Sequence, residues 1–251
     1  MITGNNVRFY LLTAAFLCVT IQLSAQSQWY KYPGNPVFEF GKSGEWDQNK
    51  IPHVVLVEND QYHMWYKGWT SESRVLMGIG YATSPDGIHW RKYEDNPVDF
   101  GFEDEDWAWT YYSFDIIRKD SVYLMWYTGF DKKDSTRCVG YAWSHNGFNW
   151  TKYPEPVMLP GKEDEWDGAH IFDFKVIFDG NLYHAWYNAY GIIYPAPLRI
   201  GYASSYDGII WQKHAANPVM DCGSTGSWED VAVDIHSVNF NGSQYEMWYD
   251  G

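Results

Sequence analysis

A repeat of about sixty residues constrains this chain more than any other feature of its sequence. The pattern Trp-x-Lys recurs at spacings of 61, 60 and 61 residues, at Trp29, Trp90, Trp150 and Trp211. A Trp-Tyr pair after Met or Ala keeps the same period, at 64–66, 125–127, 185–187 and 247–249. Independent markers that share one period indicate copies of one supersecondary unit.

Each copy reads as four strands. In the first copy we expect strands over Pro52–Val57, Tyr62–Tyr66, Ile79–Ser84 and His89–Tyr93. These runs are rich in β-branched and aromatic residues, and Gly, Pro, Asn or Asp separates them. No stretch shows a helical period. A four-stranded unit repeated in this way predicts a β-propeller, in which each copy is one blade.

The third and fourth strands of each copy are joined by Asp-Gly or Asn-Gly, at 86–87, 146–147 and 207–208. This dipeptide favours a type I′ hairpin turn, in which both central residues have positive φ. We therefore interpret Asp86 and Asp207 as turn residues rather than as ligands or catalytic acids.

Both ends of the chain bear on the expected ring. Trp29–Tyr32 reads as a lone fourth strand, which would close the ring by pairing with the last blade. Three whole copies follow, and the chain stops at Gly251, after the second strand of another. Soluble proteins avoid open sheet edges. We therefore expect a C-terminally truncated fragment.

Residues 1–25 read as a signal peptide, and 26–251 as the propeller domain. Arg8 is the only charged residue before an apolar run from Phe9 to Leu23, and Ala25 supplies the small residue of a cleavage site. The alternative is a membrane anchor, but the run is short for a spanning helix of about 20 residues. We expect a secreted or periplasmic protein without a membrane span after cleavage. The sequence does not indicate whether Cys138 and Cys222 pair.

Composition narrows the classes of binding partner that we expect. The chain has 18 Lys and Arg against 32 Asp and Glu, and its formal net charge is −14. Nucleic acid is therefore excluded as an expected partner, because binding phosphates needs a basic face. The 15 Trp and 21 Tyr provide either an aromatic core or surfaces on which sugars stack. The sequence does not indicate an oligomeric state.

The repeat resembles a known superfamily. Trp46-Asp47, Tyr62-x-Met64-Trp65-Tyr66, Ile79-Gly80-Tyr81-Ala82 and the following Ser-x-Asp-Gly are similar to segments of the arabinanase, levansucrase and invertase propellers. Glycoside hydrolase families 43 and 32 and the family 130 mannoside phosphorylases belong there. The resemblance implies an all-β fold, a five-bladed β-propeller of four-stranded antiparallel blades, incomplete in this chain.

The resemblance also implies a function. We expect a glycoside hydrolase-like protein that acts on plant or microbial polysaccharide or oligosaccharide through paired carboxylates. The acid motifs of these families are not matched at 50–53, 112–115 or 171–173. A non-catalytic carbohydrate-binding or interaction propeller is therefore the alternative.

Candidate catalytic residues are those that break the repeat. Asp115 and Asp173 stand in inner strands, at places that other copies fill with apolar or small residues. Asp173 and Lys175 could instead form a structural ion pair. Asp47 belongs to an acid-Trp pair that recurs in all copies, which favours capping between blades. The resemblance implies Asp47 as base, Asp115 as the orienting acid and Asp173 as proton donor.

The expected substrate is a carbohydrate. Candidate stacking residues are Trp107, Trp109 and Tyr190, and candidate sugar-binding residues near the mouth are His170, Asp234 and His236. Phosphorolysis is disfavoured, because a phosphate site needs several cations. The segments expected to face the pocket offer mainly Lys50, Arg118 and Lys175. No cofactor or metal is expected. The resemblance leaves room for a calcium ion in the central channel, near His170 or His236, but no ligand spacing calls for one.

Overall fold

The computed structural model describes residues 29–70, 77–98, 100, 107–133, 135–192 and 196–251. Contacts divide the chain into two units, 1–35 and 36–251. In the first unit, Trp29–Tyr32 is irregular, so the predicted closing strand is not formed. The predicted signal peptide lies outside the described residues, and export stays a prediction.

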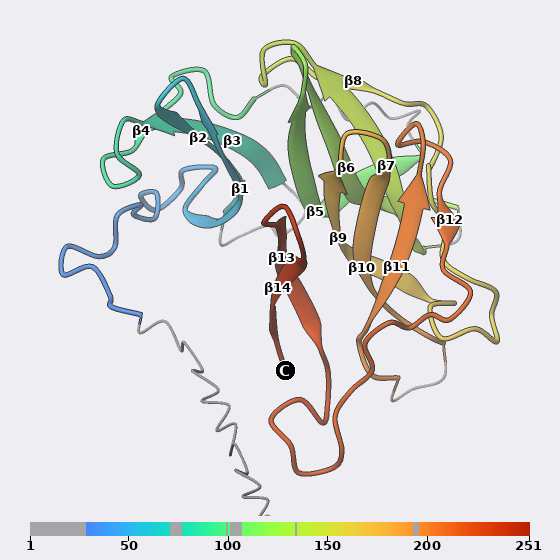
Figure 1. Cartoon of the computed structure of the whole chain (residues 1–251). Coiled ribbons are helices and arrows are strands. Elements are labelled where there is room, and N and C mark those ends of the chain that lie inside the picture. The colour runs from blue at the N-terminus through green and yellow to red at the C-terminus, as the bar shows by residue number, and fades with distance from the viewer. Residues whose placement is uncertain (1–28, 71–76, 99, 101–106, 134, 193–195) are drawn as a thin grey trace, which may run out of the picture. The chain divides into compact units, whose positions relative to one another are not determined.

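The second unit is all-β, as predicted, and Figure 1 shows its sheets. No helix occurs among its described residues, and none of the chain's described segments forms a helix able to cross a membrane. The strands are β1 (Asn49–Glu58), β2 (Gln61–Trp69), β3 (Met77–Ser84), β4 (Arg91–Lys92), β5 (Ala108–Lys119), β6 (Val122–Asp131), β7 (Arg137–Ser144), β8 (Thr151–Lys152), β9 (His170–Phe178), β10 (Tyr183–Tyr190), β11 (Arg199–Ser205), β12 (Gln212–Lys213), β13 (Asp234–Phe240) and β14 (Tyr245–Asp250).

The four-stranded antiparallel blade is confirmed. β1–β4 form the first blade, β5–β8 the second and β9–β12 the third, and β13–β14 begin a fourth. The fourth strand of each blade is shorter than predicted, at two residues. Blades two and three join in one eight-stranded sheet through a parallel pair, Arg137 and His170. The described sheets do not close into a ring.

The turn between the third and fourth strands differs from the prediction. Only Gly87 has positive φ in the first of these turns, so it is not type I′. Instead, the Ser84 hydroxyl accepts from the Gly87 N–H, and the Asp86 carboxylate accepts from the N–H groups of Ile88 and His89. Asp86 is thus a turn residue, as expected, and Asp207 repeats its bonds.

Aromatic side chains from the second strands form the core. Trp65 and Tyr66 are fully buried, as are their counterparts Trp126 and Tyr127. Gly80 explains one marker of the repeat, because a Cβ at that position would collide with the Tyr66 ring. The Trp of each acid-Trp pair stacks on the Tyr of its own blade, in the pairs Trp46–Tyr66, Trp107–Tyr127, Trp166–Tyr187 and Trp228–Tyr249.

Each inner strand carries a β-bulge near the same level. The Trp of each second strand pairs with one residue of the inner strand: Val54, Asp115, Lys175 or Ser237. These four residues therefore occupy equivalent positions in their blades, as counting along the repeat predicts. The preceding positions are not equivalent in all blades. Tyr66 pairs with Pro52, two residues before Val54, whereas Tyr127 pairs with Phe114, one residue before Asp115. Bulges redirect side chains and are frequent beside active sites.

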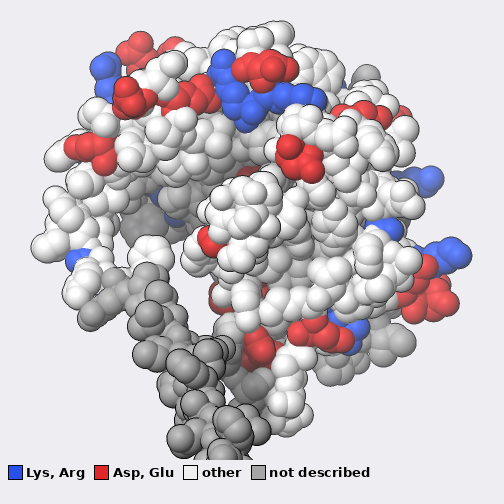
Figure 2. All heavy atoms as spheres, in the orientation of Figure 1, with Lys and Arg blue, Asp and Glu red and all other residues white. Residues whose placement is uncertain are grey.

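The surface carries both signs of charge together. Figure 2 shows Lys and Arg side chains lying against Asp and Glu rather than in a separate field. Surface pairs such as His89–Asp86, at 2.7 Å, are exposed and contribute little to stability. The charges that matter for chemistry are therefore the buried ones.

Candidate active site

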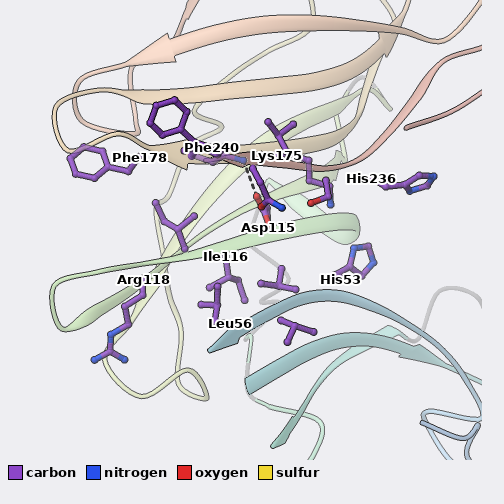
Figure 3. A pocket seen from close by; sticks show the side chains of 17 residues that line it. His53, Leu56, Asp115, Ile116, Arg118, Lys175, Phe178, His236 and Phe240 are labelled. Carbon is purple, nitrogen blue, oxygen red and sulfur yellow. Dashed lines mark hydrogen bonds between the residues drawn. The ribbon is translucent and has the colours of Figure 1, made fainter. Parts of the chain in front are cut away.

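The four inner strands line one cavity of about 490 Å³. β1, β5, β9 and β13 each contribute side chains to it. Figure 3 shows His53 and His236 toward one end, Arg118 and Phe178 toward the other, and Asp115 and Lys175 between them. The predicted shared axial cavity is therefore present in the described residues.

Asp173 lies beside the bulge of β9, two residues before Lys175. The Ser113 hydroxyl of β5 donates a 2.5 Å hydrogen bond to Asp173 Oδ1. Lys175 Nζ lies 3.9 Å from the same oxygen. The Asp173 side chain is 17% exposed and that of Lys175 is 8% exposed. The Asp173 carboxyl group therefore lies between a hydroxyl donor and a buried cation.

Asp234 starts β13 and is the second carboxyl group of the site. Burial raises the pKa of Asp234 to about 6, and the negative charge of Asp173 contributes to the increase. The two carboxyl groups therefore differ in environment. Such a difference separates a proton donor from an ionised partner.

Two further cations, Lys67 and Arg137, surround Asp173. Burial lowers the pKa of Lys67 to about 8; the charge of Asp173 opposes this decrease, and that of Arg137 adds to it. Lys67 Nζ donates a 2.6 Å hydrogen bond to the carbonyl oxygen of Tyr112. The Arg137 guanidinium lies 4.6 Å from the centre of the Tyr112 ring and 4.3 Å from that of Phe172. Lys175 makes a third cation in an otherwise acidic chain.

Three buried polar atoms of this region have no hydrogen-bond partner within the described structure: His53 Nε2, Arg137 Nε and Asp234 Oδ1. Burial, and then the charges of Lys175 and Lys67, lower the pKa of His53 well below its usual value. The imidazole is therefore neutral near pH 7. Buried polar groups without partners are rare in folded proteins, and a polar ligand would supply the missing bonds.

Asp115 lies in the axial cavity and not among these unpartnered atoms. Its Oδ2 accepts a 2.8 Å hydrogen bond from the Val176 N–H, which ties β5 to β9. Burial raises the pKa of Asp115, although the charge of Lys175 opposes the increase. Its geometry is that of a group that orients the inner strands.

The structure does not bring Asp47 into this cluster. Its Oδ2 lies 2.8 Å from Lys50 Nζ and 2.6 Å from Lys92 Nζ, and it accepts a bond from the Tyr66 hydroxyl. Asp167 occupies the corresponding place in the third blade, where Tyr187 and Lys213 contact it. The recurring acid therefore caps its own blade. The expectation of capping between blades is wrong, since every one of these partners belongs to the same sheet.

The predicted sugar-binding residues lie in different parts of the structure. The Trp107 ring stacks on Tyr127 inside its own blade, and its role as a stacking platform stays a prediction. Trp109 is 41% exposed and packs edge-on against Phe130. His170 and Tyr190 lie together, with ring centres 5.5 Å apart, and line a second cavity.

His236 forms a 3.0 Å pair with Asp250 across β13 and β14. Its side chain is 59% exposed, and Figure 3 places it at the His53 end of the axial cavity. It lies two residues from Asp234, whose pKa its charge would lower. The structure therefore brings Asp173, Asp234 and His236 to one end of the inner strands.

Four residues of the site were not predicted from the sequence: His53, Lys67, Ser113 and Arg137. Arg137 breaks the repeat, because Met77 and Leu198 stand at its position in the other blades. Lys67 also had a signal: at its position in the next blades stand Thr128 and Asn188. All these side chains bond a carbonyl oxygen of the following blade, in the pairs Lys67–Tyr112, Thr128–Phe172 and Asn188–Val233.

Two of the three cations that were expected to face the pocket lie away from Asp173. Lys50 is paired with Asp47, and Arg118 Nη1 lies 3.1 Å from Glu58 at the far end of the axial cavity. Only Lys175 of the predicted set is at the site. Among the described residues, no group of three or more His, Cys, Asp or Glu side chains could hold a metal ion. The calcium ion allowed by the resemblance stays untested.

Comparison with known proteins identifies the family. The model of the glycosyl hydrolases family 32 N-terminal domain matches residues 51–247. The chain belongs to this family. The match spans most of the described strands, which confirms the resemblance to the β-propeller glycoside hydrolase superfamily.

Several curated proteins and solved structures are similar to this chain. An uncharacterised protein of Mycobacterium tuberculosis is 24% identical over 241 residues, which cover 93% of this chain and 77% of the relative. A β-1,2-mannobiose phosphorylase of a Thermoanaerobacter species is 26% identical over 166 residues, 60% of this chain and 54% of that protein. A solved family 117 glycoside hydrolase of Zobellia galactanivorans has a TM-score of 0.63 and 20% identity, with 85% of this chain and 71% of that chain covered. This family 32 chain spans 64% of two other similar solved chains.

Proposed function

We propose that the protein is a carbohydrate-active enzyme that cleaves a glycosidic bond with Asp234 and Asp173. The observation that carries the proposal is the pair of carboxyl groups in unlike surroundings. Asp234, whose burial raises its pKa to about 6, is the proton donor to the leaving oxygen. Asp173, between Ser113 and Lys175, is the base that accepts a proton from the attacking water.

In the hydrolytic reaction, a water molecule attacks the anomeric carbon. The bond between that carbon and the glycosidic oxygen breaks, and the oxygen takes the proton of Asp234. Asp173 accepts the proton of the attacking water. His53 Nε2 and Arg137 Nε, which have no hydrogen-bond partner among the described residues, are placed to bond sugar hydroxyl groups. The same Asp173 would serve as nucleophile in a two-step reaction.

Phosphorolysis is a second candidate, and three cations favour it. The charge of Asp173 opposes the decrease that burial causes in the pKa of Lys67 and of Arg137, and Lys175 Nζ lies 3.9 Å from Asp173 Oδ1. A phosphate anion in place of the water would be stabilised by them. Its oxygen would attack the anomeric carbon and form a sugar phosphate, while Asp234 protonates the leaving oxygen.

The names of similar proteins suggest the substrates to test. One relative is a β-1,2-mannobiose phosphorylase, and the family model is that of family 32 glycosyl hydrolases. We therefore propose β-1,2-linked mannosides and fructans as the first panel, followed by arabinan and xylan oligosaccharides.

The test measures products with and without phosphate. Release of free sugar in phosphate-free buffer supports hydrolysis, and a sugar phosphate formed only with phosphate supports phosphorolysis. Asp173→Asn and Asp234→Asn should each lower kcat by about 10²–10⁴-fold. Asp86→Asn is the matched control, because Asn146 fills this turn position in the second blade. Sugar binding without turnover, unchanged by Asp173→Asn, would instead establish the non-catalytic alternative.

A further inference from the structure

A second cavity of about 630 Å³ lies beside the site, and no step of the proposed reaction uses it. Thr136, His170, Tyr190 and Ile192 are among its lining residues. A third hollow, of about 380 Å³, adjoins it and reaches Trp166 and Arg199. The two hollows share Gly191, Ile192 and Ala196, so together they form one groove.

The groove lies next to Arg137 and Phe172, which are neighbours of the proposed catalytic residue Asp173. Arg137, whose guanidinium lies over Phe172, pairs in parallel with His170, and its N–H donates to His170 Nδ1 at 3.2 Å. The Tyr190 ring lies 5.2 Å from that of Phe172, the residue before Asp173. A molecule that occupies both Asp173 and the groove therefore passes His170 and Tyr190.

The lining has the chemistry of a sugar-binding surface. Tyr190 and Trp166 offer aromatic rings, and the His170 imidazole, whose Nδ1 accepts the Arg137 N–H, adds a polar group. Gly168, Ala169, Gly191 and Ala196 leave room because they carry little or no side chain. Sugars combine apolar ring faces with many hydroxyl groups, which suits pockets lined by aromatics and a few polar groups.

We propose that this groove is a set of sugar-binding subsites, so that the protein acts on oligosaccharides of three or more units rather than on disaccharides alone. The proposal rests on the proposed function, because it places the bond to be cleaved at Asp173 and Asp234. The glycan runs from these carboxyl groups past His170 and Tyr190 toward Trp166. The carboxylates of Glu163 and Glu165 line the outer hollow, which favours a neutral glycan over an acidic one.

The experiment compares disaccharides with tetrasaccharides of the same linkage, in the β-1,2-mannan and inulin series. Affinity is measured by calorimetry, and kcat/KM is measured wherever turnover occurs. We expect the wild-type protein to bind one tetrasaccharide about tenfold more tightly than its disaccharide, the effect of about one stacking platform. Tyr190→Ala should remove this advantage, and Ala196→Trp should do so by filling the groove. Both variants should lower the affinity for the tetrasaccharide more than that for the disaccharide.

Tyr206→Ala is the matched control, because Tyr206 is 81% exposed in a turn and lines neither hollow. It should keep the preference for the tetrasaccharide. Equal affinity for both lengths in each series, no binding of either tetrasaccharide, or equal losses on both lengths in Tyr190→Ala overturns the groove. A protein that binds tetrasaccharides through the groove but cleaves nothing refutes the proposed function and leaves the groove standing.

Discussion

Trp65 Nε1 donates a 2.9 Å hydrogen bond to the carbonyl oxygen of Gly147, which lies 82 residues further along the chain, in a turn of the next blade. Trp126 and Gly208 repeat this bond at 2.8 Å with the same separation. Since both Trp side chains are fully buried, each bond joins two blades through the core. The Trp of the repeat thus serves packing between blades as well as within them.

Trp65→Phe should therefore destabilise the protein. The substitution removes one of the two indole donors of the Gly147 carbonyl oxygen, the other being Trp150 Nε1 at 3.2 Å, and it opens a small cavity, at a combined loss of about 1–3 kcal/mol. Chemical denaturation measures this loss as a lower midpoint. Trp109→Phe, at a 41% exposed position, should change the free energy of unfolding by less than about 0.5 kcal/mol. Equal losses in both variants would contradict the role of the bond.

Asp47→Asn tests whether Asp47 is structural or a base. The variant leaves Lys50, with a 2% exposed side chain, beside a neutral amide, and we expect a loss of about 3 kcal/mol or more. Asp167→Asn should lose less, because its Lys213 is 29% exposed. The kcat of the folded Asp47→Asn protein should stay close to that of wild type. A large loss of kcat at unchanged stability would restore Asp47 as a catalytic residue.

The same carboxylate gives a pH dependence of stability. Burial alone would raise the pKa of Asp47, but hydrogen bonds from Lys50 and Lys92 outweigh burial and lower it. The unfolded chain then binds this proton more readily than the folded protein, so the contribution is full above about pH 5 and declines as pH falls through the folded pKa. Denaturation midpoints of wild type and Asp47→Asn should converge in acid. A constant difference between pH 7 and acid would contradict this linkage.

The blades were predictable because their residues recur. The Trp-Tyr pairs and Gly80 repeat at each copy, and a sixty-residue period needs no knowledge of three-dimensional contacts. The turn type was not predictable from Asp-Gly alone, since Ser84 and Asp86 bond the turn's N–H groups and leave positive φ only at Gly87. Local side-chain bonds here override the dipeptide preference.

The candidate site was predictable only where a residue broke the repeat within an inner strand. Asp173 and Asp115 did so and were found. Arg137 breaks it at the start of β7, outside the strands that were compared, and Lys67 shares its polar position with Thr128 and Asn188. Their approach to Asp173 depends on the packing of successive blades. The bulges also shift the inner strands by one residue in some blades, which counting from the sequence cannot show.

Arg137→Met should lower activity with little effect on folding. The first blade carries Met77 at the same position, so an unbranched apolar side chain fits there. Removing a buried cation that has an unpartnered Nε removes a desolvation penalty, and stability should change by less than about 1 kcal/mol. We expect kcat/KM to fall about 10–100-fold. An unchanged kcat/KM, with or without phosphate, would remove Arg137 from the site.

The pH profile of the reaction reports Asp234. Its pKa is raised to about 6, so the fraction able to donate a proton declines above that pH, and kcat/KM should fall about tenfold per pH unit on the alkaline side. Asp234→Asn should abolish this limb and lower kcat, whereas Asp86→Asn should keep the wild-type profile. A limb that persists in a folded Asp234→Asn protein would assign the donor to another group.

Stability provides an independent measurement of the same carboxyl group, with the opposite sign to Asp47. Because burial raises the pKa of Asp234, the folded protein binds this proton more tightly than the unfolded chain between about pH 4 and pH 6. The contribution of Asp234 to the free energy of unfolding therefore decreases as pH rises through that window. Asp234→Asn removes this dependence, so the variant should gain stability relative to wild type between pH 4 and pH 7. A gain without loss of kcat would leave Asp234 as a strained residue that takes no part in proton transfer, and a loss of kcat without the gain would contradict its raised pKa.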